Sequence, residues 1–277
     1  MISIIICSRL SKCPVVFEEH IHTTIGNVPY EIIWIDNSRN DRNMCQAYNL
    51  GVTQAKYDYL CFMHEDIVFH SNDWGKMAIE SMDDPSIGML GVQGCVYYCE
   101  STTYWTKSYF RKAHIIQDRN GKKEKVYEQD YPCGSDVVAI DGLWMFIKRE
   151  CFDKGLRWDD DHFRNFHMYD MDMSMQMIHH GYRIKILEDL WIEHLSWGNF
   201  NKDFYEDNII FHEKWDKLLP VATIKITGEV KILSQKAAFK EICRLGKECA
   251  LSKKRLLMWP YRLATKVSLL LKKDIWS

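Results

Sequence analysis

The sequence predicts an α/β fold in which helices cover both faces of a mostly parallel sheet. Two apolar runs, residues 2–7 and 30–36, are rich in β-branched side chains and end in polar ones, as expected for parallel strands that are buried on both faces. Residues 14–24 leave room for a crossover helix, and a helical segment over 43–55 leads to a third apolar run at 59–63. This alternation of strand and helix is typical of an open, doubly wound sheet.

The later elements are predicted from the same patterns. They are, in order, a helix over 73–82, two strands within 87–98, two strands and the start of a helix within 137–152, a last strand within 183–194 and a helix over 202–219. Pro220 should end that last helix because proline cannot continue it. Residues 101–136 are polar, aromatic and rich in turn residues, so we expect a mobile excursion there.

Length and charge indicate a large domain with an appendage. The 277 residues suffice for one large α/β domain. Residues 225–277 carry 13 Lys and Arg against 4 Asp and Glu, whereas the rest of the chain carries 23 against 34. We therefore predict an acidic body over 1–220 and a basic, helical extension over 221–277. Nucleic acid is not an expected partner, because the body is acidic.

Cysteine spacing and hydropathy indicate a cytoplasmic protein. The ten cysteines include no C-x-x-C pair, which favours reduced thiols over a zinc or disulfide framework. No uncharged apolar run reaches the ~18 residues of a membrane span, and no signal peptide is recognisable. The basic extension contains two expected helices within 236–273, which suit the anionic inner surface of a membrane. Packing within a homodimer and a partly disordered tail are alternatives that the sequence leaves open.

Polar residues gather where the predicted parallel strands end, which is the edge at which such sheets bind ligands. They are Ser8 and Arg9 after the first strand, Asp36 and Asn37 after the second, and His64, Glu65 and Asp66 after the third. A buried carboxylate is costly unless it is paired, hydrogen-bonded or bound to a metal. These residues therefore predict a site, although Asp36 also suits a turn, and strand alternation turns Glu65 away from its neighbours.

A second polar group lies in the stretch "HMYDMDMSMQMIHHGY" at 167–182. Its methionines recur at helical spacing and Gly181 ends the pattern, so we expect them to pack in the core. Asp170 and Asp172 are about 200° apart around a helix, so both cannot face one site if both are helical. We expect Asp170 at or before the helix start, where it is either a cap alone or part of a site.

Six motifs in order resemble the GT-A fold glycosyltransferases of the family 2 type, most closely the prokaryotic branch that builds capsule and surface polysaccharides. The motifs are "ISIIICSR", "IIWIDNSRN", "NLGVTQAKYDYLCFMHED", "DGLWMFIKRECF", "YDMDMSMQMIHHGY" and "IEHLSWG". The resemblance covers roughly residues 1–200. His64 departs from it at the first Asp of the D-x-D metal motif, and Tyr169 departs from it at the Glu that precedes Asp170.

The resemblance assigns roles to residues of this chain. It implies catalytic residues at Asp170, the base, and Asp172, and a metal site for Mn²⁺ or Mg²⁺ at Asp66 and His194. The nucleotide would be bound by Ser8, Arg9, Asp36, Asn37 and Glu65. Donor and acceptor sugars would meet His64, Asp141, Gly142 and Trp197.

The chemistry of sugar transfer suits these residue types. A divalent cation stabilises the departing diphosphate, and a positioned carboxylate can take the proton of the acceptor hydroxyl. We expect the start of the helix to keep Asp170 ionised. The Q-x-x-R-W signature of processive synthases is missing after Asp170, which favours inverting transfer of one sugar, such as a hexose, from a nucleotide-sugar donor to a saccharide or lipid-linked acceptor.

Two other functions remain open at the level of sequence. A nucleotidyltransferase that makes sugar nucleotides would also use an α/β sheet and metal-binding Asp residues, but "CSRLSKCP" lacks the glycines of its phosphate loop. A binding module that keeps only the fold need not retain Asp36, Asp66, Asp170 and His194 together.

Overall fold

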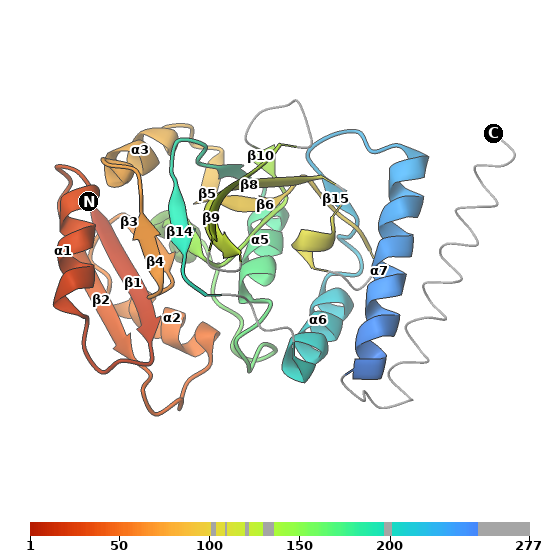
Figure 1. Cartoon of the computed structure of the whole chain (residues 1–277), viewed down its shortest axis with the longest axis horizontal. Coiled ribbons are helices and arrows are strands. Elements are labelled where there is room, and N and C mark those ends of the chain that lie inside the picture. The colour runs from red at the N-terminus through yellow and green to blue at the C-terminus, as the bar shows by residue number, and fades with distance from the viewer. Residues whose placement is uncertain (101–103, 109, 120–121, 130–135, 197–200, 249–277) are drawn as a thin grey trace, which may run out of the picture.

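The computed structural model describes residues 1–100, 104–108, 110–119, 122–129, 136–196 and 201–248. Its first part is the predicted alternation of strands and helices (Figure 1). The elements are β1 (Ile2–Ser8), α1 (Val15–Thr24), β2 (Tyr30–Asp36), α2 (Met44–Gln54) and β3 (Tyr59–Met63). Both β2 and β3 pair with β1 in parallel, so the carboxyl ends of all three strands lie at one edge, as the sequence predicts.

The central sheet has seven strands in the order β10-β13-β5-β12-β3-β1-β2. Its remaining members are β5 (Ile87–Gly91), β10 (Asp136–Val137), β12 (Trp144–Lys148) and β13 (Arg183–Ile186). Strand β12 runs antiparallel to both of its neighbours, β3 and β5. The sheet is therefore mixed, and the reversal of β12 brings the turn before it to the carboxyl end of β3.

A second sheet forms from strands beside the predicted site. Its order is β11-β6-β8-β14-β4, with β9 paired to β8. The strands are β4 (Ile67–Phe69), β6 (Gln93–Cys95), β8 (Arg111–Arg119), β9 (Lys122–Gln129), β11 (Ala139–Ile140) and β14 (Ile192–His194). The expected excursion over 101–136 is therefore largely a β8–β9 hairpin preceded by the short 3₁₀ helix η1 (Trp105–Lys107). Long-range pairing with β6 and β14 orders it, and turn composition could not reveal that pairing.

The helices follow the sequence pattern with shifted ends. They are α3 (Trp74–Ser81), α4 (Arg149–Asp153), α5 (Tyr169–His179), α6 (Lys202–Lys214) and α7 (Gly228–Glu248). Helix α6 stops before the predicted end at 219, and α7 begins before the predicted 236. Val230 and Ala238 of α7 pack with Tyr97 of β7 (Tyr97–Tyr98), which pairs with β15 (Val221–Ala222). The second predicted basic helix lies outside the described residues.

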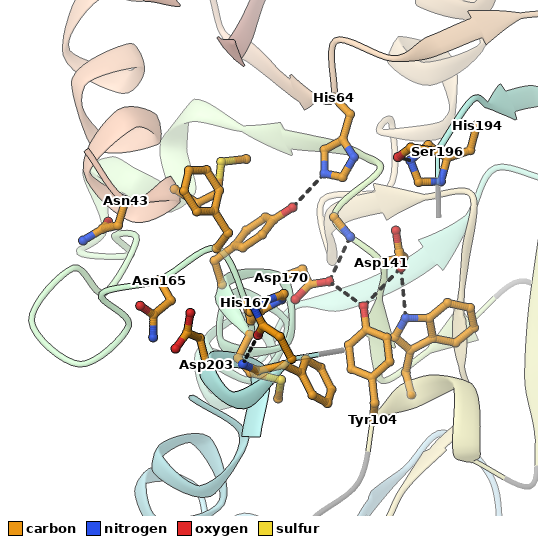
Figure 2. Close-up of a pocket in the computed structure, with 18 of the residues that line it drawn as sticks. Asn43, His64, Tyr104, Asp141, Asn165, His167, Asp170, His194, Ser196 and Asp203 are labelled. Carbon is orange, nitrogen blue, oxygen red and sulfur yellow. Dashed lines mark hydrogen bonds between the residues drawn. The ribbon is translucent and has the colours of Figure 1, made fainter. Parts of the chain in front are cut away.

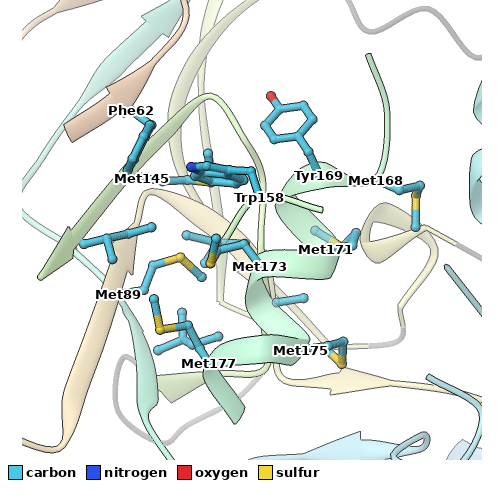
Figure 3. Close-up of a cluster of buried hydrophobic side chains, with 14 of the residues drawn as sticks. Phe62, Met89, Met145, Trp158, Met168, Tyr169, Met171, Met173, Met175 and Met177 are labelled. Atoms are coloured by element: carbon cyan, nitrogen blue, oxygen red, sulfur yellow. The ribbon is translucent and has the colours of Figure 1, made fainter. Parts of the chain in front are cut away.

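The core has one layer on each face of the central sheet. Along β3, Leu60 and Phe62 face the layer under α2 and α5, whereas Cys61 and Met63 face the layer under α1 and α3. The methionines of α5 are buried on every side of the helix, which confirms that they are core residues (Figure 3). No helix of the described residues combines the length and the apolar character needed to cross a bilayer.

Candidate active site

A cavity of about 960 Å³ opens at the carboxyl ends of β1 and β3. Its lining includes Arg9, His64, Asp141, Gly142, Asp170 and His194 from the predicted set. Arg9 follows β1, His64 follows β3, His194 ends β14, Asp170 lies in α5, and Asp141 and Gly142 form the turn between β11 and β12; Figure 2 labels His64, Asp141, Asp170 and His194. Trp197, predicted to meet the acceptor, lies outside the described residues.

The predicted nucleotide residues fall into two groups. Arg9 lines the cavity, whereas Asp36 is exposed, is not in the lining and accepts a hydrogen bond from the backbone N–H of Ser38 at 2.9 Å. Hydrogen bonding from Ser38, first by its side chain and second by its backbone N–H, lowers the pKa of the Asp36 carboxyl. Asn37 is buried, and its side chain bonds both the N–H and the carbonyl of Arg42. It thereby shapes the loop before α2, and the structure does not bring either side chain to the cavity.

Ser8 and Glu65 bond each other beside the cavity. The Ser8 hydroxyl donates to the Glu65 carboxylate, which also lies 3.4 Å from the N–H of Arg9. Neither residue lines the cavity. Glu65 therefore ties the ends of β1 and β3 together and holds Arg9 in place. Residues of the loop before α2 and of the first turn of that helix, which were not predicted from the sequence, line the cavity instead. They are Asn40, Asp41, Arg42, Asn43 and Gln46.

His64, Asp66 and His194 form a cluster that could hold a cation. One nitrogen or oxygen atom from each lies within 4.8 Å of the others. Nδ1 of His64 is 3.8 Å from Asp66, and Nε2 of His194 is 3.6 Å from it. Backbone bonds fix this geometry, since the N–H of Leu195 donates to the carbonyl of Asp66 at 3.0 Å. Asp66 and His194 were predicted ligands; His64, predicted to meet sugar, joins them.

The donor set fits a divalent first-row cation. Two imidazoles and one carboxylate suit Mn²⁺ or its neighbours and leave coordination positions for phosphate oxygens or water. Burial and the nearby His194 lower the pKa of His64, which favours the neutral form that a ligand requires.

Asp170 lies in the first turn of α5 and points into the cavity (Figure 2). Its carboxylate accepts hydrogen bonds from the backbone N–H groups of Gly142, at 3.0 Å, and Met171, at 2.8 Å. Burial, and secondly the charge of Asp141, raise the pKa of Asp170 to about 7. The expectation that the helix start keeps this group firmly ionised is therefore wrong, because burial outweighs the hydrogen bonds.

Residues of η1 complete the wall beside Asp170. The Tyr104 hydroxyl is 3.2 Å from Asp141 and 3.3 Å from Asp170, and the Trp105 indole N–H donates to Asp141 at 3.1 Å. The sequence reasoning missed both aromatic residues. The aromatic content of the segment "YYCESTTYW" was the available signal, but nothing local placed it over the site.

Asp172 does not reach the cavity. It is 1% exposed and pairs with Lys214 Nζ at 2.6 Å, Trp215 Nε1 at 2.8 Å and Gln176 Nε2 at 2.8 Å. Burial raises the pKa of Asp172, and Lys214 opposes that rise. Both aspartates are helical, so the helical repeat that brings Asp170 to the cavity turns Asp172 towards the end of α6.

Comparisons with known proteins bear on the family and the fold of the chain. Residues 3–215 match the model of a glycosyltransferase-like family. The solved structure of GalNAc-T7 with UDP, GalNAc and Mn²⁺ superposes with a TM-score of 0.53 at 14% identity, over 78% of this chain and 49% of that one. A mannosyltransferase from Pyrobaculum calidifontis gives a TM-score of 0.44 at 13% identity, over 99% of this chain and 87% of that one.

Coverage and sequence identity limit what each match shows. The chain spans about half the length of GalNAc-T7, 49%, and an identity this low shows the fold alone. A search of the curated proteins gave no match. The family model covers more than half of the chain, and the fold is that of the GT-A glycosyltransferases. The chain belongs to the glycosyltransferase-like family.

Proposed function

We propose that this protein moves one sugar from a nucleotide-sugar donor to a hydroxyl group of a saccharide or lipid-linked acceptor. One observation carries the proposal: His64 and His194 of the His–Asp–His cluster line the same cavity as Asp170, a buried carboxylate with a pKa of about 7, although Asp66 is not itself part of the lining. Family membership supports it. The GalNAc-T7 structure, which has the same fold, contains UDP, GalNAc and Mn²⁺.

The proposed reaction is a direct displacement at the anomeric carbon. The acceptor oxygen forms a bond to that carbon, its proton passes to the Asp170 carboxylate, and the bond from the anomeric carbon to phosphate oxygen breaks to release the nucleoside diphosphate. A pKa of about 7 suits a base that works near neutral pH, because much of it is ionised and it still binds a proton well. His64, Asp66 and His194 could hold a divalent cation, which would neutralise charge on the departing diphosphate.

Inversion is the outcome that we propose. Retention through a covalent intermediate would need a free carboxylate as nucleophile. Besides Asp170, three acids line the cavity: Asp41, which pairs with Arg42 at 2.9 Å, Asp203, and Asp141. Only Asp141 among them shares a hydrogen-bond partner with Asp170 among the described contacts, and it already accepts hydrogen bonds from Tyr104, Trp105 and the N–H of Leu143. These bonds make it a weak nucleophile and suit it to shaping the sugar pocket.

The residues that line the cavity beside β1 and α2 suit the binding of a nucleotide. Arg9 and Arg42 bring positive charge, and Asn43 caps α2 with its side chain. Arginine is well suited to phosphate groups. A role in surface polysaccharide synthesis and contact of the basic extension with a membrane remain proposals from the sequence.

The test is incubation with a panel of UDP-, GDP-, dTDP- and CMP-sugars and Mn²⁺, followed by ³¹P NMR. We expect slow hydrolysis of one donor class to its nucleoside diphosphate, or to CMP in the case of a CMP-sugar, with water as acceptor. Release of pyrophosphate from a sugar phosphate and a nucleoside triphosphate would indicate a nucleotidyltransferase instead. Binding of a donor without any turnover, with or without acceptor sugars, would indicate a binding module.

A further inference from the structure

The two positions at which the motifs depart from the family pattern touch each other. Nε2 of His64 lies 2.9 Å from the hydroxyl oxygen of Tyr169, although 105 positions separate them in the sequence (Figure 2). We infer that Tyr169 is a positioning residue for the cation site: it accepts a hydrogen bond from Nε2–H of His64 and so leaves Nδ1 of that ring free as a ligand. This inference rests on the proposed function and deepens its cation site.

The orientation of the His64 ring supports this assignment. Nε2 points to Tyr169, whereas Nδ1 lies 3.8 Å from Asp66. A neutral imidazole carries its proton on one nitrogen and a lone pair on the other. A hydrogen bond that keeps the proton on Nε2 therefore presents the lone pair of Nδ1 to the cluster of Asp66 and His194, in the way that outer partners fix metal-binding histidines.

Tyr169 is held firmly enough to direct its partner. Its side chain is buried, and its ring packs against those of Tyr48 and Trp158, with centroids at 5.7 and 6.0 Å. Phe62, two residues before His64, packs on the same two rings at 5.0 and 4.9 Å. One aromatic cluster thus supports both ends of the hydrogen bond, and Figure 3 shows Phe62, Trp158 and Tyr169 together.

Gly142 leaves the space that the Tyr169 hydroxyl occupies. A Cβ atom at this position would lie 2.1 Å from that oxygen, far closer than atoms can approach. The N–H of Gly142 meanwhile bonds Asp170. The same glycine therefore permits the contact to His64 and helps to place the base, so a larger residue would disturb both.

A site with His64 as third ligand has two imidazoles and one carboxylate. Imidazole suits first-row transition metals, whereas Mg²⁺ prefers oxygen ligands. The inference therefore implies that the protein selects Mn²⁺ over Mg²⁺, and that this selectivity depends on Tyr169 as well as on the ligands.

The test compares Mn²⁺ binding by the full-length wild type and the Tyr169→Phe variant, measured from the EPR signal of free Mn²⁺ with Mg²⁺ as competitor. We expect roughly 10- to 100-fold weaker Mn²⁺ binding in the variant, the usual effect of losing an outer partner, and a smaller preference over Mg²⁺. Long-range ¹H–¹⁵N NMR of the metal-free protein should show His64 protonated on Nε2 in the wild type and on a mixture of nitrogens in the variant.

Matched variants separate positioning from packing. Tyr48→Phe removes a buried hydroxyl that has no hydrogen-bond partner among the described residues, from a ring that packs against Tyr169, and it should leave Mn²⁺ affinity unchanged. Asp66→Ala gives the reference for loss of a ligand. In a His64→Ala background, Tyr169→Phe should cause no further loss of Mn²⁺ affinity.

The outcomes distinguish this inference from the proposed function. Equal Mn²⁺ affinity and the same tautomer in wild type and Tyr169→Phe would overturn the inference and leave the cation site standing. So would an undiminished effect of Tyr169→Phe in the His64→Ala background, because the tyrosine would then act through another group. A wild-type protein that binds no Mn²⁺ would overturn the cation site itself, and the inference with it.

Discussion

Two aspartates in the first turn of α5 have similar burial but opposite surroundings. Asp170 faces the cavity and receives hydrogen bonds from backbone N–H groups and from Tyr104. Asp172 faces α6 and makes an ion pair with Lys214 and hydrogen bonds with Trp215 and Gln176. Among the described residues no cationic side chain bonds Asp170, whereas the ammonium group of Lys214 lies 2.6 Å from Asp172.

The difference teaches that charge pairing, and not burial alone, separates the carboxylate that we propose as the base from the structural one. Burial raises the pKa of both carboxyls. At Asp170, no cationic side chain of the described residues opposes the rise in pKa. The cavity also gives a substrate access to this carboxylate. At Asp172 the ammonium group of Lys214 opposes the rise and fills the position that a substrate would need. The first arrangement suits proton transfer, and the second suits attachment of α6 to α5.

The largest expected effect is on catalysis at Asp170. Replacing it by Asn keeps the size of the side chain but removes the proton acceptor, so transfer should fall by roughly 10² to 10⁴. Donor and Mn²⁺ affinities should change little, because the cation cluster is untouched. Turnover and isothermal titration on the same preparation measure both quantities, and Asp172→Asn is the matched control. Near-normal turnover by Asp170→Asn would show that Asp170 is not the base and that the two aspartates do not differ in catalytic importance.

The next largest effect is on stability at Asp172. Asp172→Ala leaves the indole N–H of Trp215 without its carboxylate partner and removes one of the two carboxylates that bind Lys214, which keeps Asp159 at 2.6 Å. Breaking a fully buried pair from one side costs about 3–5 kcal/mol, and the remaining bond to Asp159 should bring the loss of unfolding free energy in chemical denaturation below that range. The double variant with Lys214→Met should recover part of it. A free energy of unfolding equal to that of wild type would show that the pair does not hold α6 in place.

A smaller effect is expected from pH. Asp170 must be ionised to accept a proton, and its pKa is about 7. Donor turnover should therefore fall about tenfold for each pH unit below 7 and level off above it. The Asp170→Asn variant should lack this limb of the profile. A wild-type rate that stays level down to pH 5 would contradict the assigned pKa.

The smallest effect is expected at Asp36. Its carboxylate is exposed, is not in the cavity lining and bonds only the neighbouring Ser38 among the described contacts. Asp36→Ala should therefore change the nucleotide Kd by less than about 0.5 kcal/mol, roughly twofold. Arg42→Ala, in the cavity lining, is the comparison. A tenfold higher nucleotide Kd for Asp36→Ala would place Asp36 in the nucleotide site, as the sequence first suggested.

Much of the fold could be predicted from the sequence, because most strands and helices are marked by the types and spacing of neighbouring residues. The apolar strands β1, β2 and β3, the cap of α2 at Asn43 and the end of α5 near Gly181 all follow from residue types at fixed spacing. Strand direction is not local, so the reversal of β12 was missed. The hairpin β8–β9 was missed for the same reason, since its order depends on pairing with β6 and β14.

The site could be predicted only where a residue stands at a strand or helix end. That rule pointed to Asp66 and Asp170, and the family resemblance added His194; the structure brings Asp66 and His194 together and places Asp170 in the cavity lining. The rule could not show that Lys214 pairs with Asp172, or that Tyr169 bonds His64, because 42 and 105 positions separate the partners. The 200° between Asp170 and Asp172 around a helix was the one local sign that the two aspartates have different roles.

The most direct test of Asp170 as the base uses an acceptor that has no proton to lose. With the donor found in the panel, the Asp170→Asn variant should be nearly inactive towards hydroxyl acceptors and water. Azide needs no base, so the variant should form the glycosyl azide, with inverted anomeric configuration, at a rate close to that of the wild type with azide. ¹H NMR identifies the product and its anomer. If azide leaves the variant as inactive as before while the wild type forms the glycosyl azide, Asp170 does not act by removing the acceptor proton.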